Sequence, residues 1–187
     1  MAAAPPVPPL VERALTQAAQ LGFERSCSAE TGRLLHVLAA SRGTRRVAEI
    51  GTGAGVGAAW IVSALPPPVP VFTAESDAER AAAARELFAA DANVHVLEGD
   101  WRETLPPQAP FDLVFFDAAK HLRPDEDAPL ARGLLAPGGL VLLDDLTPGR
   151  SAEDDPVRTA WLREPRLTAV ELQVSAREAV LLVAAAG

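Results

Sequence analysis

Tyrosine is absent from this 187-residue sequence, and cysteine, methionine and lysine each occur once. A single cysteine, Cys27, excludes an internal disulfide framework and a cysteine-rich zinc site, and it favours a cytoplasmic setting. No apolar run reaches the roughly 18 residues that a membrane span requires. Residues 1–9 lack the basic and apolar regions of a signal peptide, so we expect neither membrane insertion nor export.

Positive charge is also scarce. Lys and Arg together number 17 against 25 for Asp and Glu, which gives a net charge of −8. This balance disfavours sequence-independent nucleic-acid binding, which needs a surface that neutralises phosphates. A small basic cluster is formed by Arg42, Arg45 and Arg46. Every cation except Lys120 is an arginine, which makes that lysine a candidate functional residue.

The hydrophobic share of 49% and the length fit one domain with a full core. We expect a disordered tail over residues 1–9 and a single domain over 10–187. Helical spacing of apolar residues predicts helices over 10–21 and 30–40. The remaining chain alternates helices with short apolar strands, and the predicted strands cover residues 47–50, 69–74, 94–97, 111–116, 140–143, 167–174 and 179–184.

This order predicts an α/β protein with a Rossmann-like, mostly parallel seven-stranded sheet. The last two strands are joined tightly, so they form an antiparallel C-terminal hairpin. Helices are expected on both faces of the sheet, over residues 58–65, 76–90, 129–135 and 156–162. Ser76 and Glu79 have the spacing of a capping box, with Ser76 as the N-cap of its helix.

Polar residues follow the predicted strands at the edge where open α/β sheets bind ligands. The first strand ends in a turn, Glu49 to Gly57, that has glycine at every second position from Gly51. Gly53-x-Gly55-x-x-Ala58 loosely fits the dinucleotide fingerprint, and a tight turn without a ligand is the structural alternative. Glu75 ends the second strand, where it either accepts hydrogen bonds from ribose hydroxyls or serves as an acid at a helix N-terminus.

The ordered motifs resemble those of class I S-adenosylmethionine-dependent methyltransferases, and more narrowly the catechol O-methyltransferase-like, metal-dependent O-methyltransferases. The resemblance covers about residues 28–150. It is carried by Glu49-Ile-Gly-Thr-Gly, Glu75, Gly99-Asp100, Phe111-Asp-Leu-Val-Phe-Phe-Asp-Ala-Ala-Lys120, Pro137-Gly-Gly139 and Asp144-Asp145. It implies methyl transfer from S-adenosylmethionine to a hydroxyl of a small, aromatic acceptor.

The resemblance also implies residue roles. The cofactor would lie against Glu49, Gly51, Gly53, Gly55, Glu75, Ser76, Gly99, Asp100, Trp101 and Asp117. In this arrangement Glu75 holds the ribose, and Asp100 and Trp101 border the adenine. Asp117, Asp144 and Asp145 would bind Mg²⁺ or Ca²⁺, because a hard cation offsets the repulsion among converging carboxylates. Lys120 would be the general base, since a lysine can lose its proton whereas an arginine cannot.

Some residues depart from the family pattern. Asp145 stands where the family usually has Asn, and Val56-Gly57 replaces an aromatic residue and a Ser. The family often has a tyrosine shortly after the lysine at position 120. This chain has no tyrosine, and His121 follows Lys120 instead. We also expect a homodimer or a monomer–dimer equilibrium, because the helix over 10–21 has an apolar face without an assigned partner.

Three other functions remain open from the sequence. A tRNA-modifying methyltransferase is disfavoured by the net charge of −8. A nicotinamide-dependent oxidoreductase rests on the loose glycine spacing and lacks a Tyr-x-x-x-Lys pair, since the chain has no tyrosine. A relative that binds the cofactor without catalysis is the third.

Overall fold

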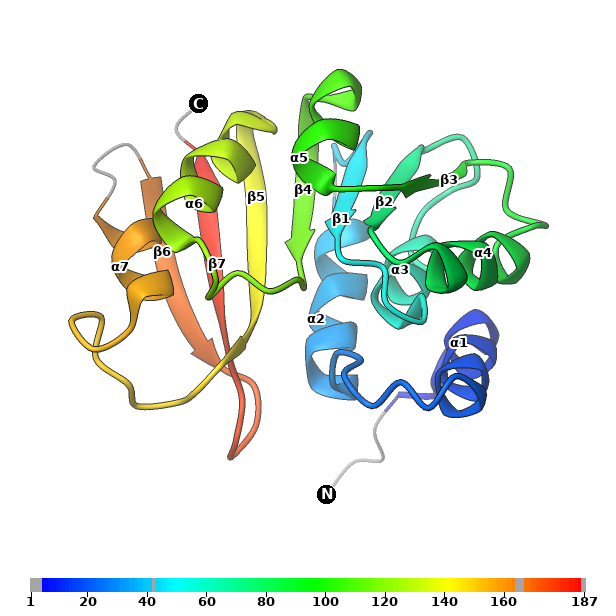
Figure 1. Cartoon of the computed structure of the whole chain (residues 1–187), viewed down its shortest axis with the longest axis horizontal. Helices are drawn as coiled ribbons and strands as arrows, with labels where there is room; N and C mark the ends of the chain where they lie inside the picture. Colours follow the sequence, from blue (N-terminus) through cyan, green and yellow to red (C-terminus); the bar gives the residue numbers. More distant parts are fainter. Residues whose placement is uncertain (1–4, 42, 164–166, 186–187) are drawn as a thin grey trace.

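The structure, a computed structural model, describes residues 5–41, 43–163 and 167–185. Seven strands form one sheet in the order β3-β2-β1-β4-β5-β7-β6 (Figure 1). Their bounds are β1 Val47–Ile50, β2 Val71–Glu75, β3 Val94–Glu98, β4 Phe111–Phe116, β5 Leu135–Leu146, β6 Leu167–Gln173 and β7 Ala179–Ala185. The predicted fold class is therefore confirmed, including its strand count.

Strand direction creates the ligand-binding edge. Strands β1 to β5 run parallel where they pair, and β7 pairs antiparallel with both β5 and β6. β1 lies between β2 and β4, so the chain leaves β1 toward one side of the sheet and later returns on its other side. Such a switch point opens a crevice at the carboxyl ends of the strands, because the connections on its two sides diverge.

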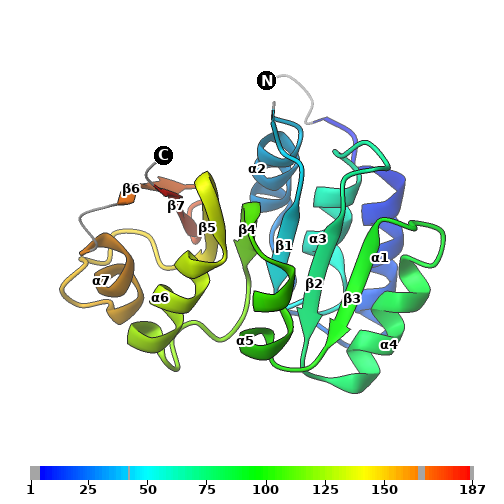
Figure 2. The same ribbon diagram turned by 90° about the horizontal axis from the view of Figure 1, so that it is seen from above.

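Helices cover both faces of the sheet (Figure 2). The side chains of α2, α3 and α4 pack on one face, with α1 outside α3 and α4, while α5, α6 and α7 pack on the other. Their bounds are α1 Pro9–Gln20, α2 Ala29–Ala39, α3 Val56–Val62, α4 Ala78–Leu87, α5 Trp101–Thr104, α6 Pro124–Gly133 and α7 Pro156–Leu162. A 3₁₀ turn, η1, spans Pro106–Gln108. No described helix is long and apolar enough to cross a bilayer.

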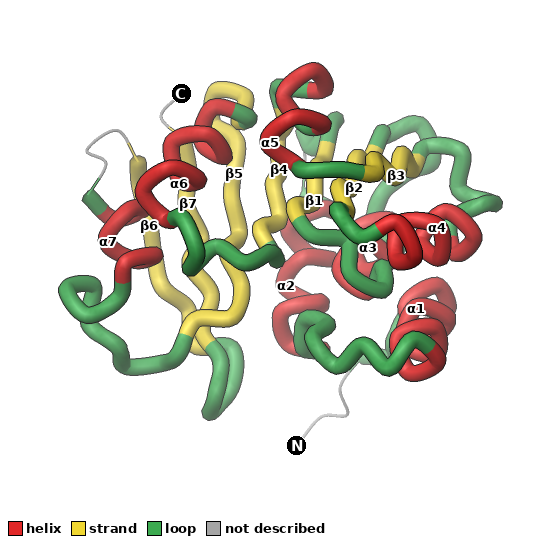
Figure 3. The backbone as a smooth tube through the Cα atoms, viewed as in Figure 1, coloured by secondary structure: helices red, strands yellow, loops and turns green. Residues whose placement is uncertain are grey.

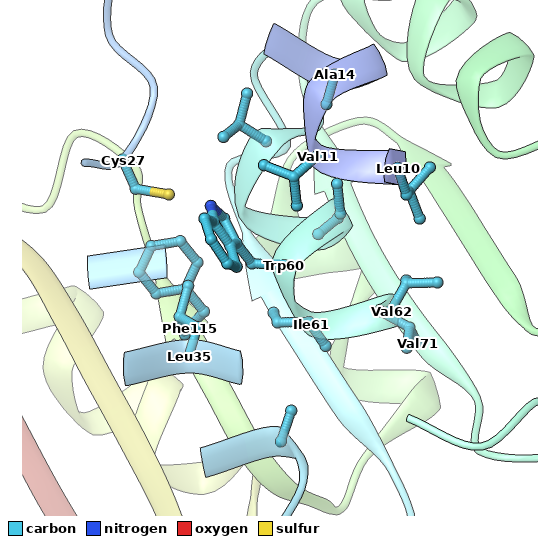
Figure 4. Close-up of a cluster of buried hydrophobic side chains, with 14 of the residues drawn as sticks. Leu10, Val11, Ala14, Cys27, Leu35, Trp60, Ile61, Val62, Val71 and Phe115 are labelled. Carbon is cyan, nitrogen blue, oxygen red and sulfur yellow. The ribbon is translucent and has the colours of Figure 1, made fainter. Parts of the chain in front are cut away.

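The core follows the alternation of side chains along the strands. In β4, Leu113 and Phe115 enter one hydrophobic cluster, and Val114 and Phe116 enter the cluster on the opposite face. Figure 4 shows Trp60 of α3 in the same buried cluster as Cys27, Leu35 and Phe115. Burial on both faces explains why β4 is a nearly continuous apolar run in the sequence, interrupted at Asp112.

Several local predictions are wrong or incomplete. Asp77, not Ser76, is the N-cap of α4, and its carboxylate accepts a hydrogen bond from the Arg80 N–H. β5 begins at Leu135, so Pro137-Gly138-Gly139 lies inside this strand, at a register shift against β4. The short helix α5 was not predicted. α6 begins at Pro124, five residues before the predicted start.

The N-terminal region also differs from expectation. Leu10, Val11 and Ala14 of α1 are buried in the cluster that contains α3, so the apolar face of α1 has a partner within the chain. Residues 1–4 of the expected tail lie outside the described residues. Residues 5–8 form no helix or strand, and Pro9 already begins α1.

Candidate functional site

A cleft of about 590 Å³ lies along the carboxyl ends of the central strands. Residues that follow β1, β2, β3, β4 and β5 line it, together with the α1–α2 connection. Figure 3 draws the connections after β4 and β5, and the connection between α1 and α2, as green loops. The cleft therefore joins a half built by the loops after β1 to β3 with a half built by the loops after β4 and β5.

The turn after β1 favours glycine at two positions, where φ is positive and a Cβ would meet a neighbouring residue. Gly51 has φ +95°, and a Cβ there would lie 2.4 Å from the carbonyl oxygen of Asp117. Gly53 has φ +54°, and its Cβ would lie 2.7 Å from the Phe23 ring. Both residues line the cleft, so a ligand there meets bare backbone.

Glu75 is almost fully buried at the end of β2, and its carboxylate is held from three sides. One oxygen accepts the Gly53 N–H at 2.8 Å. The other accepts the Asp77 N–H at 2.9 Å and the Arg80 guanidinium at 2.8 Å. Each carboxylate oxygen has two acceptor positions, so room remains for a ribose hydroxyl. The Arg80 ion pair was not anticipated from the sequence.

Beyond β3, Gly99 adopts φ +133° and leads into Asp100, the N-cap of α5. The carboxylate of Asp100 pairs with Arg102 at 3.1 Å. Trp101 is 7% exposed and lies against Phe116 with ring centroids 5.5 Å apart. All three predicted residues line the cleft, and most of the Trp101 side chain is buried in the core.

Two predicted cofactor residues lie outside the cleft lining. Glu49 is 1% exposed beneath the glycine turn, where the Thr73 hydroxyl and the Ala58 N–H donate to its carboxyl group. Burial raises the pKa of Glu49 to about 8. Gly55, with φ +87°, is the N-cap of α3 and faces Leu87. Both residues shape the turn from behind, whereas Ser76 does line the cleft.

The predicted acid cluster is assembled in the other half. Asp117, Asp144 and Asp145 each offer a carboxylate oxygen, and the three oxygens lie within 4.8 Å of one another. Burial, together with the neighbouring carboxylates of Asp145 and Glu178, raises the pKa of Asp144 to about 7. Burial also raises the pKa of Asp117 well above its usual value, with Lys120 opposing and Asp144 reinforcing the change.

A divalent cation fits this cluster. Asp144 is fully buried, and within the described ranges its Oδ2 has no hydrogen-bond partner. A buried carboxylate oxygen without a donor is costly unless a proton or a cation satisfies it. Carboxylate oxygens are the ligands that Mg²⁺ and Ca²⁺ prefer, so Asp117, Asp144 and Asp145 are suited to hold such an ion.

Two residues beside Asp144 were missed by the sequence analysis. The Thr31 hydroxyl of α2 lies 3.2 Å from Asp144 Oδ1 and 3.2 Å from Glu178 Oε1. A hydroxyl has one proton, so it can donate to only one of these acceptors at a time. Glu178 lies 147 positions from Thr31 along the chain, at the hairpin between β6 and β7. No local pattern links residues so far apart.

Lys120 lies next to the acid cluster and is 5% exposed. Its Nζ is 3.8 Å from the Asp145 carboxylate. Asp145 itself adopts φ +56°, the one left-handed residue other than glycine in the described chain. Asn and Asp tolerate this backbone better than most residues, which explains why either can follow Asp144.

The remaining sequence candidates divide between the cleft and the surface. Cys27 and His121 line the cleft, and burial raises the pKa of the Cys27 thiol, with the charges of Asp117 and Asp144 adding to the effect. Arg46 of the basic cluster lies at the opposite end of β1. Its guanidinium covers the Phe72 ring at 4.5 Å and donates to the Gln108 carbonyl at 2.6 Å. Arg42 lies outside the described residues.

Comparison with known proteins places this fold among the methyltransferases. A family model described as a methyltransferase domain matches residues 48–146, which include the glycine turn, Glu75 and the acid cluster. The chain belongs to this methyltransferase domain family. The resemblance noted from the sequence motifs is thereby confirmed.

Curated relatives carry a more specific name. A Mycobacteroides abscessus protein provisionally named an O-methyltransferase is 34% identical over 129 residues, which are 66% of this chain and 60% of that protein. A Mycobacterium bovis protein with the same provisional name is 32% identical over 159 residues, 82% of this chain and 66% of that protein. The matched region thus spans less than two thirds of the length of these relatives.

A solved structure agrees over nearly the whole chain. The O-methyltransferase TomG from Streptomyces achromogenes, in complex with S-adenosylmethionine, is 27% identical, with a TM-score of 0.82. The alignment covers 97% of this chain and 92% of that one. A cofactor-bound protein from MTB is 28% identical with a TM-score of 0.81, covering 96% and 90% of the two chains.

Proposed function

We propose that this protein is an S-adenosylmethionine-dependent O-methyltransferase that methylates a hydroxyl of a small aromatic acceptor with the help of a divalent cation. The observation that carries the proposal is the convergence of three carboxylates and Lys120 at one half of a cleft, which Asp117, Asp145 and Lys120 line while Asp144 is buried beside them. The other half holds the glycine turn and Glu75. The names of the curated relatives and the S-adenosylmethionine complex of TomG support the same activity.

Each half of the cleft would serve one reactant. Gly51 and Gly53 present backbone to the methionine portion of S-adenosylmethionine, and Glu75 accepts hydrogen bonds from the ribose hydroxyls. S-adenosylmethionine supplies the methyl group when it is bound. The acceptor hydroxyl lies on the side of the acid cluster. The cleft thus holds the methyl donor and the acceptor in a fixed relative orientation. Such alignment supplies a large part of the rate enhancement in two-substrate reactions.

The acid cluster and Lys120 would prepare the hydroxyl. Asp117, Asp144 and Asp145 hold the cation, which when bound makes a nearby hydroxyl easier to deprotonate. Lys120 Nζ lies beside this cluster and takes the hydroxyl proton. Asp145, at 3.8 Å, receives the resulting ammonium as an ion-pair partner. Arginine in place of Lys120 would keep the charge and lose the base.

A chelator and one substitution test this proposal. Excess EDTA should abolish transfer of a labelled methyl group to a catechol, while calorimetry shows S-adenosylmethionine affinity within about twofold. Lys120→Arg should lower turnover by about 10²–10⁴, the range for loss of a general base. Arg13→Lys on the exposed side of α1 is the matched control and should retain full activity. Full transfer in excess chelator would overturn the role of the metal.

A separate outcome would contradict the proposed cofactor. If calorimetry detects NADH binding and no S-adenosylmethionine binding, the proposed function is wrong as a whole. Binding of S-adenosylmethionine with no transfer to any phenolic acceptor, with Mg²⁺ present, would instead contradict the O-methyltransferase assignment and favour binding without catalysis.

A further inference from the structure

The cleft lining carries six cations and six carboxylates, whereas the whole chain has a net charge of −8. The lining includes five arginines, at positions 25, 80, 102, 123 and 150. Two of them are neutralised in the half assigned to the cofactor. Arg80 pairs with Glu75 at 2.8 Å, and Arg102 pairs with Asp127 at 2.6 Å. These two have a structural explanation within the protein.

The other three arginines are exposed, and their charges are weakly compensated. Within the described part of the chain, Arg25 and Arg150 form no ion pair or side-chain hydrogen bond. Arg123 has one partner, the exposed carboxylate of Glu126 three residues later, with 3.9 Å between the guanidinium nitrogen and the carboxylate oxygen. Such an exposed pair contributes little and leaves the guanidinium available to a ligand. We call Arg25, Arg123 and Arg150 the rim arginines.

The rim arginines come from three separate segments that line the cleft: the loop after β4, the loop after β5 and the α1–α2 connection. Arg123 lies three residues after Lys120, and Arg150 lies five residues after Asp145. Arg25 lies midway along the chain between Phe23, whose ring faces Gly53, and Cys27, and all three residues line the cleft. Three segments distant in sequence thus bring like charges to one opening, although like charges repel.

Apolar side chains lie in the same half. Leu146 and Val157 are buried, Leu122 is 70% exposed, and all three line the cleft. An acceptor whose hydroxyl reaches the acid cluster would lay its ring against such side chains. A substituent on the far side of that ring would point away from the acid cluster, and the rim arginines, which are exposed and line the same cleft, are available to it.

We propose that the acceptor carries an anionic group, a carboxylate or a phosphate, at the end remote from the methylated hydroxyl, and that the rim arginines bind it. This inference rests on the proposed function, and it adds the charge of the acceptor. Guanidinium groups bind carboxylate and phosphate oxygens through paired N–H donors. They also offset the repulsion that Asp117, Asp144 and Asp145 would otherwise exert on an incoming anion, and they raise its rate of encounter.

Binding of three matched acceptors tests the proposal independently of catalysis. The probes are 3-(3,4-dihydroxyphenyl)propionate, its neutral methyl ester, and dopamine, each titrated by calorimetry into the protein with S-adenosylhomocysteine and Mg²⁺ at low salt. We expect the carboxylate to bind at least tenfold more tightly than the ester, with dopamine weakest. Added NaCl should reduce this preference, because the rim arginines are exposed.

Substitution of the rim arginines should remove the preference. In the variant Arg25→Gln/Arg123→Gln/Arg150→Gln, the ratio of carboxylate to ester affinity should fall to about one. S-adenosylhomocysteine affinity, measured separately, should stay within about twofold of wild type. Arg13→Gln, an exposed arginine of α1, is the matched control and should keep the wild-type ratio. Phenyl phosphate and 3-phenylpropionate as competitors distinguish a phosphate from a carboxylate as the preferred group.

The outcomes separate this inference from the proposed function. Equal binding of carboxylate and ester by the wild type, or an unchanged ratio in the triple variant, would refute the anionic acceptor and leave methyl transfer to neutral phenols intact. A strong carboxylate preference that disappears in the triple variant supports anion binding by the rim arginines, even if no methyl transfer is detected. In that case only the proposed methyltransferase function would be contradicted.

Discussion

Glu49 is a buried acid whose removal should change how stability depends on pH. Its carboxyl group is 1% exposed, and its two donors, the Thr73 hydroxyl and the Ala58 N–H, do not overcome the effect of burial, which raises its pKa to about 8. The substitution Glu49→Gln keeps the shape and removes the titration. The Thr73 hydroxyl also contacts the Thr52 hydroxyl, so it can rotate to accept a hydrogen bond from the new amide.

The sign and size of the effect follow from the two pKa values. The ordinary glutamate pKa is 4.5 and the folded value is about 8, so the folded protein binds a proton that the unfolded chain releases. Stability therefore falls as the pH rises from about 4.5 through about 8. At about 1.4 kcal/mol per pKa unit, the complete loss is of the order of 5 kcal/mol. A typical domain has about 5–15 kcal/mol in total, so this loss is easy to measure.

Urea unfolding at about pH 5, 7 and 9, followed by circular dichroism, measures the effect. We expect similar free energies of unfolding for the wild type and Glu49→Gln at about pH 5, where Glu49 is protonated in the folded protein. At about pH 9 the variant should be more stable by several kcal/mol. Glu86→Gln, on the exposed side of α4, is the control and should follow the wild-type curve. Parallel curves for the wild type and Glu49→Gln would refute the reasoning.

Three further predictions concern the two halves of the cleft and the assembly. Glu75→Ala should weaken S-adenosylmethionine binding by about 1–3 kcal/mol, the range for lost charge-assisted hydrogen bonds; unchanged calorimetric affinity in a folded variant would remove the ribose assignment. Asp145→Asn should retain Mn²⁺ binding in calorimetry with a changed preference between Mg²⁺ and Ca²⁺, since an amide oxygen is a neutral ligand; complete loss of binding would contradict the assignment. Because the apolar face of α1 packs against α3 within the chain, the expected homodimer loses its argument from the sequence, and light scattering should give a mass near the chain mass of 19.6 kDa; about twice that mass would instead establish self-association.

Local patterns were sufficient to predict the fold class. The apolar run Phe111–Phe116 and the polar residue after each strand were enough to place β4 and the ligand-binding edge. Asp117, Asp144 and Asp145 were expected together because parallel strands bring their carboxyl ends to one edge, and the structure does bring these acids together. Their roles in binding a metal remain predictions.

Boundaries and distant partners could not be predicted in the same way. Ser76 and Asp77 are both good N-caps, and the choice depends on Glu75, which accepts the Asp77 N–H. Pro137-Gly138-Gly139 fell between the predicted helix over 129–135 and the predicted strand over 140–143, yet it lies within β5, at a register shift against β4. Contacts such as Thr31 with Glu178 depend on how the hairpin meets α2, which is a property of the assembled sheet.

The position of β1 between β2 and β4 has a consequence for how this scaffold could diversify. One set of connections, after β1, β2 and β3, lines the half assigned to the cofactor, and another set, after β4 and β5, lines the half assigned to the acceptor. Changes of length or sequence between Leu146 and Asp155 therefore alter one half and leave Gly51, Gly53 and Glu75 untouched. The strand order makes the scaffold modular. Acceptor specificity can therefore change, in evolution or by engineered loop exchange, while the binding site for the methyl donor is kept.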